Sequence, residues 1–492
     1  MQDKNSTQPF ENNEPRQGSR FLSSSTRIHS LSDRNTRKQH GGPARPARSK
    51  LEQFFANPTD TPLADAFTSK GAVHPFVGMQ PVPQPRWNAV WNEIAAIPRT
   101  GKSVAYIHIP FCENHCLFCG FYQNAWRKDA GPTYVDMVVN EMRRSKDQIW
   151  QSKGPIHAVY FGGGTPSALD APQLAQLLKA VHKYLPLAPD CEITVEGRIH
   201  NFTDAKIKAC LDNGANRISI GVQTFKERLR NRMGRKAGRA QIIKFLQSLV
   251  ETDRATVVID LIYGFPEQSL EDWENDVKTA ISTGIHGIDL YSLNLIGSTP
   301  LVTAIEKGKF EMPPEMSEKG EYYRRGTRMM HDARWQGISS THWRRDTRER
   351  NFYNLMVKSG ANCLAFGSGA GGLLNGYSFR NDGNLESYMT KAMAGEKTFS
   401  FLMKQPDEHA LFNRIKGEME LGRLNVTWLA EQCGDKWDSA ISPLIRQWGS
   451  CGLLTYDGDW IDLTLAGRFW QVTMTVSLLE WIKLTLAQQI AA

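Results

Sequence analysis

The feature that most constrains the fold is a regular alternation of apolar, β-rich segments with helical segments between residues 101 and 295. The β-rich segments span 104–109, 157–161, 191–195, 217–222, 256–262 and 287–293. The helical stretches between them span 134–150, 172–184, 204–212, 240–250 and 270–283. Strands that are apolar almost throughout and are separated by helices are typical of a parallel sheet covered by helices. Six such units predict an α/β fold with a partial (β/α)6 barrel, since a closed barrel has eight.

Three cysteines, Cys112, Cys116 and Cys119, follow the first β-rich segment with C-x3-C-x2-C spacing. Three thiolates on one loop can each bind a different iron of a [4Fe–4S] cluster. Such clusters usually have four thiolate ligands, so one iron would be left open for a substrate. A structural zinc site needs a second ligand pair at a compatible spacing, and none follows nearby. Zinc binding and chance clustering are the alternatives, and the spacing favours a catalytic iron–sulfur site.

Several other polar residues fall near the carboxyl ends of the predicted strands, where (β/α) barrels carry their chemistry. Glu196 ends the third strand, Gln223 ends the fourth, and Asp260 lies late in the fifth. The glycine triplet 162–164 follows the second strand, and its backbone can approach an amino-acid group closely. The structural alternatives are a tight turn for the triplet, ion pairs for the carboxylates and a loop amide for Gln223.

The cysteine motif carries a family resemblance. The string YIHIPFCENHCLFCG at positions 106–120 resembles the radical S-adenosylmethionine (SAM) enzymes, and within them the oxygen-independent coproporphyrinogen III oxidase (HemN) group. The string GFYQN at positions 120–124 is most similar to the anaerobic haem-degrading HutW/ChuW branch. The resemblance covers roughly residues 70–490. It implies a [4Fe–4S] cluster on the three cysteines, SAM on the open iron, and a low-potential electron donor such as a flavodoxin.

The resemblance also assigns SAM contacts to this chain. The matching positions are Tyr106, Phe118, Gly163, Gly164, Thr165, Glu196, Gln223, Arg235, Asp260 and Asn294. In this family the glycine-rich loop binds the amino group of the methionine moiety. Tyr106 and Phe118 match adenine-side positions, and Asn294 matches a backbone contact. Reduction of the cluster then cleaves the S–C5′ bond of SAM to give a 5′-deoxyadenosyl radical.

The substrate implied by the resemblance is a tetrapyrrole. In the HutW/ChuW branch, haem is methylated from SAM and its macrocycle is opened, which releases iron. One rival function is oxidative decarboxylation of coproporphyrinogen III, the HemN reaction. HemN enzymes carry an extra cysteine directly after the cluster glycine, where this chain has Phe121. A rival of another class is a haem chaperone, as in the HemW branch.

Residues 296–395 contain a helix near 315–335 and a concentrated set of arginines. These arginines are Arg324, Arg325, Arg328, Arg334, Arg344, Arg345, Arg348 and Arg350. Such runs are usually solvated faces, and the alternative is that some pair with the carboxylates of an anionic substrate, such as tetrapyrrole propionates. His342 is a candidate axial ligand for haem iron, although a lone histidine is more often packed or hydrogen-bonded. The segment AFGSGAGG at 365–372 resembles the HemN segment near a second SAM, but it departs at Ser368, Gly369 and Gly371.

The remaining regions complete a predicted five-part organisation. Residues 1–50 are predicted to be a disordered tail, 51–100 an N-terminal arm, 101–295 the barrel, 296–395 its extension with the substrate region, and 396–492 a C-terminal cap. The cap resembles a winged helix, with helices at 408–421 and 437–448 and a hairpin signal at Asp457-Gly458.

Charge and hydropathy restrict the partners. The first 50 residues hold ten Lys/Arg and four Asp/Glu, which is +6 of the net +8. The rest of the chain is nearly neutral, and this argues against a nucleic-acid partner. Neither a membrane-spanning apolar run nor an export signal is evident. Because the cluster thiolates need a reducing compartment, we expect a cytoplasmic protein.

Overall fold

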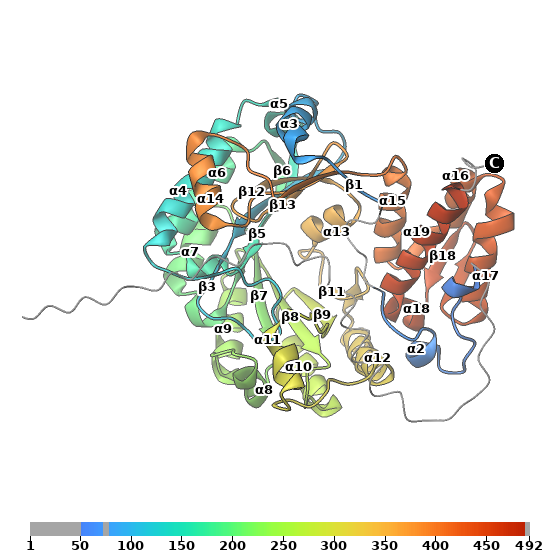
Figure 1. The fold of residues 1–492 in the computed structure, drawn as a ribbon. Helices are drawn as coiled ribbons and strands as arrows, with labels where there is room; N and C mark the ends of the chain where they lie inside the picture. Colours follow the sequence, from blue (N-terminus) through green and yellow to red (C-terminus); the bar gives the residue numbers. More distant parts are fainter. Residues whose placement is uncertain (1–50, 72–77, 488–492) are drawn as a thin grey trace, which may run out of the picture.

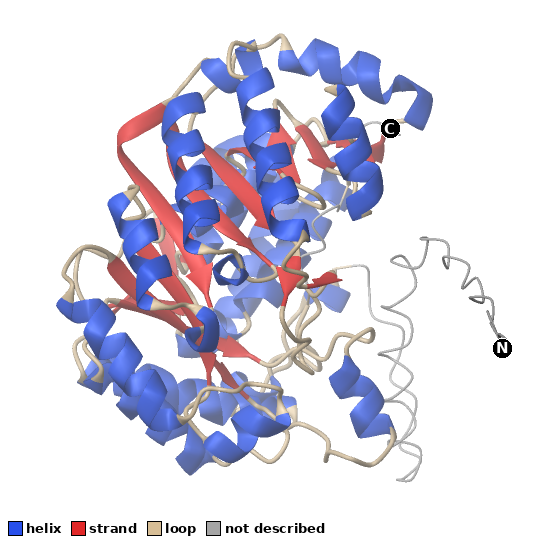
Figure 2. Ribbon diagram, turned by 90° about the vertical axis from the view of Figure 1, so that its left-hand side faces the viewer, coloured by secondary structure: helices blue, strands red, loops and turns tan. Residues whose placement is uncertain are grey.

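A large mixed sheet, covered on its outer face by helices, forms the body of the molecule, and a smaller helical unit packs beside it (Figure 1; Figure 2). The computed structural model describes residues 51–71 and 78–487, so the predicted disordered tail lies outside the described residues. The central strands are β2 (Ser103–Ile109), β5 (Ile156–Gly163), β6 (Leu187–Gly197), β7 (Arg217–Gln223), β8 (Thr256–Tyr263) and β9 (Gly287–Ser292). They pair in parallel in that order. The six predicted strands are therefore confirmed.

Helices join consecutive strands and cover the convex side of the sheet (Figure 2). They are α4 (Ala130–Arg144), α5 (Ile149–Ser152), α6 (Ala171–Tyr184), α7 (Asp204–Asp212), α8 (Glu227–Arg232), α9 (Arg239–Glu251) and α10 (Leu270–Ser282). In α6, Leu174, Leu177, Leu178 and Val181 are buried, which is the i, i+3, i+4, i+7 stripe of a helix packed on a sheet. The predicted helix at 134–150 is divided into α4 and α5, and α8 was not expected from the sequence.

The sheet extends beyond the six predicted strands at both edges. β12 (Asn362–Phe366) pairs in parallel with β2, which makes a seventh parallel strand. β13 (Gly371–Leu374), β14 (Tyr377–Arg380), β15 (Phe401–Lys404) and β1 (Gln80–Pro81) continue that edge in antiparallel fashion. At the other edge, β11 (His342–Arg344) pairs with β9, and β10 (Gln336–Gly337) pairs with β11.

The extension also supplies helices α11 (Pro300–Glu306), α12 (Met316–Asp332), α13 (Phe352–Lys358) and α14 (Leu385–Ala394). Helix α13 lies on the concave side of the sheet (Figure 1). Its Phe352, Tyr353 and Met356 pack against a small apolar cluster formed by Val104, Ala158 and Cys363. Apolar and aromatic side chains therefore fill the barrel interior on the side where its strands begin.

The C-terminal unit contains α15 (His409–Glu420), α16 (Val426–Cys433), a π-helical turn at Trp437–Ile441, α17 (Ser442–Ser450), α18 (Leu465–Phe469) and α19 (Gln471–Ala487). Its sheet has the order β16 (Arg423–Asn425), β18 (Trp460–Leu463), β17 (Leu454–Asp457). The predicted hairpin turn is present, with Gly458 at a φ of 57°.

The N-terminal arm links this unit to the barrel. Its first part, a short 3-10 turn at Glu52–Phe54 and α2 (Pro62–Asp65), packs against the C-terminal unit and α12. Trp448 Nε1 donates to Phe54 O at 3.1 Å. The second part, a 3-10 turn at Gln84–Arg86 and α3 (Trp87–Ala95), lies near α5 at the start of the barrel. Within the described part of the chain, no helix combines the length and the apolar character needed to cross a membrane.

Candidate active site

The three cysteines lie on a loop that leaves β2 and is closed by a short parallel pair of strands, β3 (Phe111–Cys112) and β4 (Asn124–Ala125). Cys112 and Cys116 are buried, whereas Cys119 is partly exposed. All eight cysteines of the chain are free thiols. The Phe121 amide donates to Cys119 Sγ at 3.4 Å. The loop therefore holds three reduced thiols at the carboxyl end of the first barrel strand.

Two guanidinium groups contact these thiols. Arg198 Nη2 lies 3.7 Å from Cys112 Sγ, and Arg235 Nη1 lies 3.7 Å from Cys116 Sγ. Burial raises the pKa of Cys112, and the Thr165 hydroxyl and the Arg198 charge act in the opposite direction. In the described residues, no three His, Cys, Asp or Glu side chains converge on a single-ion site. The positive charge beside the sulfurs fits a group that is held by thiolates.

Arg198 was not found from the sequence. It follows β6 by one residue, directly after Gly197, and it also donates from Nη1 to Asn114 Oδ1 at 3.1 Å. The signal available in the sequence was its position just beyond the end of a predicted strand, where barrel ligands bind. Its pairing with a cysteine 86 positions earlier depends on the tertiary fold.

The glycine-rich loop after β5 lies directly against the cysteine loop. Gly163 has a φ of 111°, and a Cβ there would lie 2.4 Å from the ring of His108. A Cβ on Gly164 would lie 2.5 Å from the carbonyl oxygen of Phe111. The Gly164 amide donates to Ile109 O at 2.7 Å, and Thr165 Oγ1 lies 3.3 Å from Cys112 Sγ. Only glycines allow this approach, and it brings three of the predicted SAM contacts beside Cys112.

The end of β7 combines an unfavourable backbone conformation with a buried polar atom that has no partner among the described residues. Gln223 has a φ of 70°, in the left-handed region that non-glycine residues seldom adopt. The pairing of β7 with β8 shifts register between Gly221 and Gln223. Gln223 Oε1 is buried and has no hydrogen-bond partner among the described residues. Buried polar atoms normally have partners, so this amide fits a ligand at the strand end, as the SAM assignment requires.

Other predicted contacts surround the same rim. Arg235 Nη2 donates to Gly221 O. The Tyr160 hydroxyl donates to Glu196, and the Gly163 backbone also hydrogen-bonds this carboxylate.

The two aromatic positions predicted for the adenine side lie on different elements. Phe118 packs edge-on against Phe265, with 5.5 Å between ring centroids. Tyr106 stacks on Tyr160, and its hydroxyl lies 3.1 Å from His108 Nδ1. Asn294 is exposed on the loop after β9, two residues beyond the strand.

Asp260 belongs to a buried network of charges. Its strand neighbour is Asp289, which accepts a bond from His342 Nδ1 at 2.7 Å. His342 Nε2 lies 3.1 Å from Glu349 Oε1, and Arg217 binds the same carboxylate through Nε and Nη2 at 3.0–3.2 Å. Burial disfavours the imidazolium, but Asp289 and Glu349 outweigh it and raise the pKa of His342 to about 9. Burial, together with the charge of Asp289, raises the pKa of Asp260.

The contacts of His342 in this network bear on its candidacy as an axial ligand of haem iron. The residue is fully buried, and both of its ring nitrogens are engaged by carboxylates. No nitrogen is free to coordinate a metal, so the hypothesis that His342 is an axial haem ligand is wrong. His342 acts as a cation that joins two acidic side chains.

The arginine run is mostly paired within the chain. Arg324 and Arg325 bind Glu321, and Arg348 binds Asp253. The other pairs are Arg325–Glu274, Arg328–Asp332, Arg345–Asp346 and Arg350–Asp190. Arg344 donates to the Gln336 side chain. These contacts support the solvated-face interpretation over substrate binding by this run.

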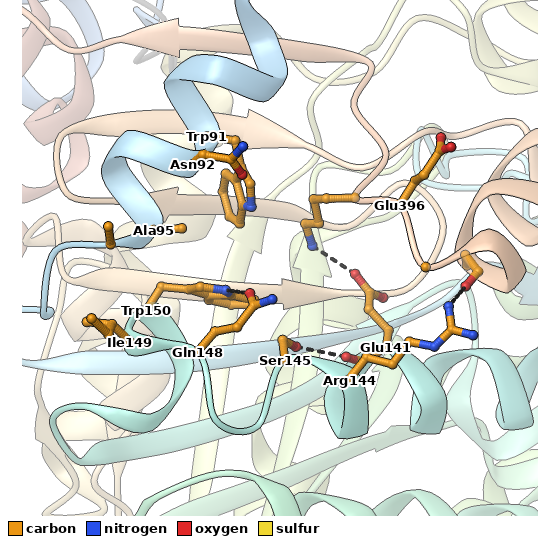
Figure 3. A pocket seen from close by; sticks show the side chains of 14 residues that line it. Trp91, Asn92, Ala95, Glu141, Arg144, Ser145, Gln148, Ile149, Trp150 and Glu396 are labelled. Atoms are coloured by element: carbon orange, nitrogen blue, oxygen red, sulfur yellow. Dashed lines mark hydrogen bonds and ion pairs between the residues drawn. The ribbon is translucent and has the colours of Figure 1, made fainter.

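A cavity of about 410 Å³ lies to the side of the barrel, between α3, α4, α5 and the end of α14 (Figure 3). Lys397 Nζ pairs there with Glu141 Oε1 at 2.8 Å. Glu141 Oε2 accepts bonds from the Gly367 amide at 3.0 Å and the Tyr388 hydroxyl at 2.8 Å. The pair thus anchors the segment that resembles the second SAM region of HemN. The cavity is lined by none of the predicted SAM contacts.

Comparison with known proteins shows which family the chain resembles. Residues 106–280 match the model of the radical SAM superfamily. The chain is 42% identical over 437 residues to an anaerobilin synthase from Escherichia coli O157:H7, covering 88% of this chain and 96% of that protein. It is 26% identical over 370 residues to the haem chaperone HemW of Bacillus subtilis, covering 74% and 96%.

Among solved structures, the coproporphyrinogen III oxidase HemN of Escherichia coli superposes with a TM-score of 0.69 at 19% identity, over 84% of this chain and 96% of that one. At that identity the match shows the fold alone. Together with the thiol loop and the glycine cradle, the sequence matches show that the chain is a radical SAM enzyme and belongs to the family that contains anaerobilin synthase.

Proposed function

We propose that the protein degrades haem under anaerobic conditions, with methyl transfer from SAM, opening of the macrocycle and release of iron. The 42% identity to an anaerobilin synthase over nearly the whole of both chains carries this proposal. The GFYQN string after the third cysteine supports it, because there the chain resembles the haem-degrading branch and lacks the additional HemN cysteine.

As a radical SAM enzyme, the chain uses a [4Fe–4S] cluster and SAM. When bound, the reduced cluster and SAM supply a carbon-centred radical. We assign the cluster to Cys112, Cys116 and Cys119, whose negative charge Arg198 and Arg235 offset. The amides of the glycine-rich loop and the orphaned Gln223 oxygen are suited to polar groups of SAM. Glu196 and Asp260 provide carboxyl groups toward its sulfonium and ribose hydroxyls.

The surroundings of the site serve to orient the ligands and exclude water. The aromatic residues Tyr106, Tyr160 and Tyr353 pack against one another below the rim, with centroid distances of 4.6–6.4 Å. A shielded site keeps a radical from reacting with solvent. We expect the electron to come from a low-potential donor such as a flavodoxin, and the protein to act in the cytoplasm.

The test is an anaerobic assay with reconstituted protein, haem, SAM and a reductant. We expect loss of the Soret band, iron release, and a methylated linear tetrapyrrole in the mass spectrum. Omission of SAM is the matched control. An unchanged haem spectrum with transfer to an apo-acceptor would instead identify a chaperone. Carbon dioxide release from coproporphyrinogen III would identify an oxidase.

A further inference from the structure

In the described part of the chain, one buried lysine has fewer hydrogen-bond partners than the buried arginines have. Among the described residues, the buried arginine and lysine side chains are Arg99, Arg217, Arg230, Arg235 and Lys319. Arg99 and Arg230 each donate to several backbone carbonyls, Arg217 pairs with Glu349, and Arg235 contacts Cys116 and a carbonyl. Lys319 is 8% exposed, and one backbone carbonyl, Leu293 O at 3.1 Å, is its hydrogen-bond partner among the described residues. An ammonium group has three donors, so Lys319 retains capacity for an anion.

The ammonium group of Lys319 lies at the rim of the barrel. Lys319 lies in the first turn of α12, and its side chain crosses Gly264, where a Cβ would lie 3.2 Å from Lys319 Cε. Gly264 directly follows β8, and Leu293 directly follows β9. Strand β8 carries Asp260, and strand β9 leads to Asn294. The ammonium group is therefore held at the same end of the barrel as the predicted SAM contacts.

A second cation comes to this position from elsewhere in the chain. Lys70 of the N-terminal arm places its Nζ 3.6 Å from the ring centroid of Phe469 in α18. Tyr323, one turn after Lys319 in α12, packs on the same Phe469 ring at 5.5 Å. Helices α2, α12 and α18 pack against one another here, between the barrel and the cap (Figure 1).

The group lacks a counter-ion within the described residues. No described carboxylate lies within ion-pair distance of Lys70 or Lys319. Burial and the neighbouring charge of Lys319 lower the pKa of Lys70 to about 7, and burial also lowers the pKa of Lys319. Clustered, partly desolvated cations are unfavourable by themselves. An anion bound among them would relieve both their repulsion and their desolvation.

We propose that Lys319 and Lys70 bind the carboxylate groups of the substrate. This inference rests on the proposed function, since a tetrapyrrole with propionate groups is a flat aromatic dicarboxylate. The inference also assigns carboxylate binding to these lysines and not to the arginine run, because most of those arginines form ion pairs within the chain.

The test measures anaerobic binding of haem and of its dimethyl ester to the reconstituted full-length protein by Soret titration. Lys319→Met keeps an unbranched apolar side chain and removes the charge, and we expect it to weaken haem binding at least tenfold. Lys70→Met, at a less buried position, should weaken it severalfold and serves if the first variant folds poorly. The ester should bind the wild type and both variants with similar, weaker affinity. Lys278→Met, on the exposed face of α10, is the matched control and should leave both affinities unchanged.

The outcomes separate this inference from the proposed reaction. Wild-type haem affinity in both lysine variants would overturn it, as would an equal loss of haem and ester binding. Failure of the wild type to bind haem at all would overturn it too. If haem binds in a Lys319-dependent way but is not degraded in the presence of SAM and reductant, the proposed reaction fails and the carboxylate site stands.

Discussion

The buried pair of Arg217 and Glu349 offers a quantitative test of how the barrel is held together. Its side chains are 4% and 0% exposed, and the guanidinium group makes three contacts with the carboxylate at 3.0–3.2 Å. Removing one partner of such a pair leaves an unpaired buried charge, which typically costs about 3–5 kcal/mol. Replacing both partners by apolar residues of similar volume often costs far less.

We therefore expect Arg217→Met and Glu349→Met to destabilise strongly, and the double variant to be more stable than either. A loss of 3–5 kcal/mol corresponds to a fall in thermal midpoint of roughly 6–20 °C for domains of 150–250 residues, and to somewhat less in this larger barrel. Glu349→Met also leaves His342 with Asp289 as its remaining acidic partner, so it should be the more damaging single change.

The assay is thermal unfolding of the three variants and the wild type at one scan rate, followed by circular dichroism under anaerobic conditions. Additive losses, with the double variant as unstable as the sum of the single ones, would refute the reasoning. That result would mean that each side chain contributes through packing and not through its charged partner.

Three further predictions follow from the site. Cys116→Ala should abolish the iron–sulfur absorption and SAM cleavage while circular dichroism stays close to wild type, whereas Cys210→Ala, a buried thiol on α7, should retain the cluster. Gln223→Gly removes the orphaned amide and eases the left-handed backbone. Its SAM affinity, measured by equilibrium binding, should fall roughly tenfold without loss of thermal stability, and unchanged affinity would remove Gln223 from the site. The folded pKa of His342, about 9, exceeds the usual 6.5. Its contribution to stability is therefore complete below about pH 6.5 and is lost as pH rises through 9, so the thermal midpoint should fall over that range in the wild type and much less in His342→Gln.

The central strands could be predicted from sequence because each is recognisable from its own residues. Each is largely apolar, and two of them carry a polar residue near the carboxyl end, Glu196 in β6 and Gln223 in β7. The break between α4 and α5 was less visible from sequence, because it depends on side-chain hydrogen bonds of Ser145 to the Glu141 carbonyl and to the Gln151 side chain.

The seventh parallel strand shows where local pattern stops being informative. β12 has five residues, and it pairs with β2, more than 250 positions earlier in the chain. Nothing in so short a segment identifies so distant a partner. The same holds for His342, whose partner Asp289 lies 53 positions away on the neighbouring strand.

Some features that were left open could have been decided from the sequence. Glu321 precedes Arg324 and Arg325 by three and four residues on one helix, which is the spacing of intrahelical ion pairs. The proximity of Lys70 to Lys319 could not be anticipated, because the two residues lie far apart in the chain. Ion pairs between residues close together on a helix can thus be predicted from sequence, whereas the absence of a counter-ion is seen only in the folded structure.

The central claim is that Cys112, Cys116 and Cys119 hold an iron–sulfur cluster with one iron open to SAM. Iron and acid-labile sulfide analysis of the anaerobically reconstituted protein, combined with Mössbauer spectroscopy before and after addition of SAM, tests it most directly. The account predicts about four irons and four sulfides per chain, with one iron site changing its spectrum when SAM is added. Absence of bound sulfide, or a cluster whose four irons are all indifferent to SAM, would contradict it.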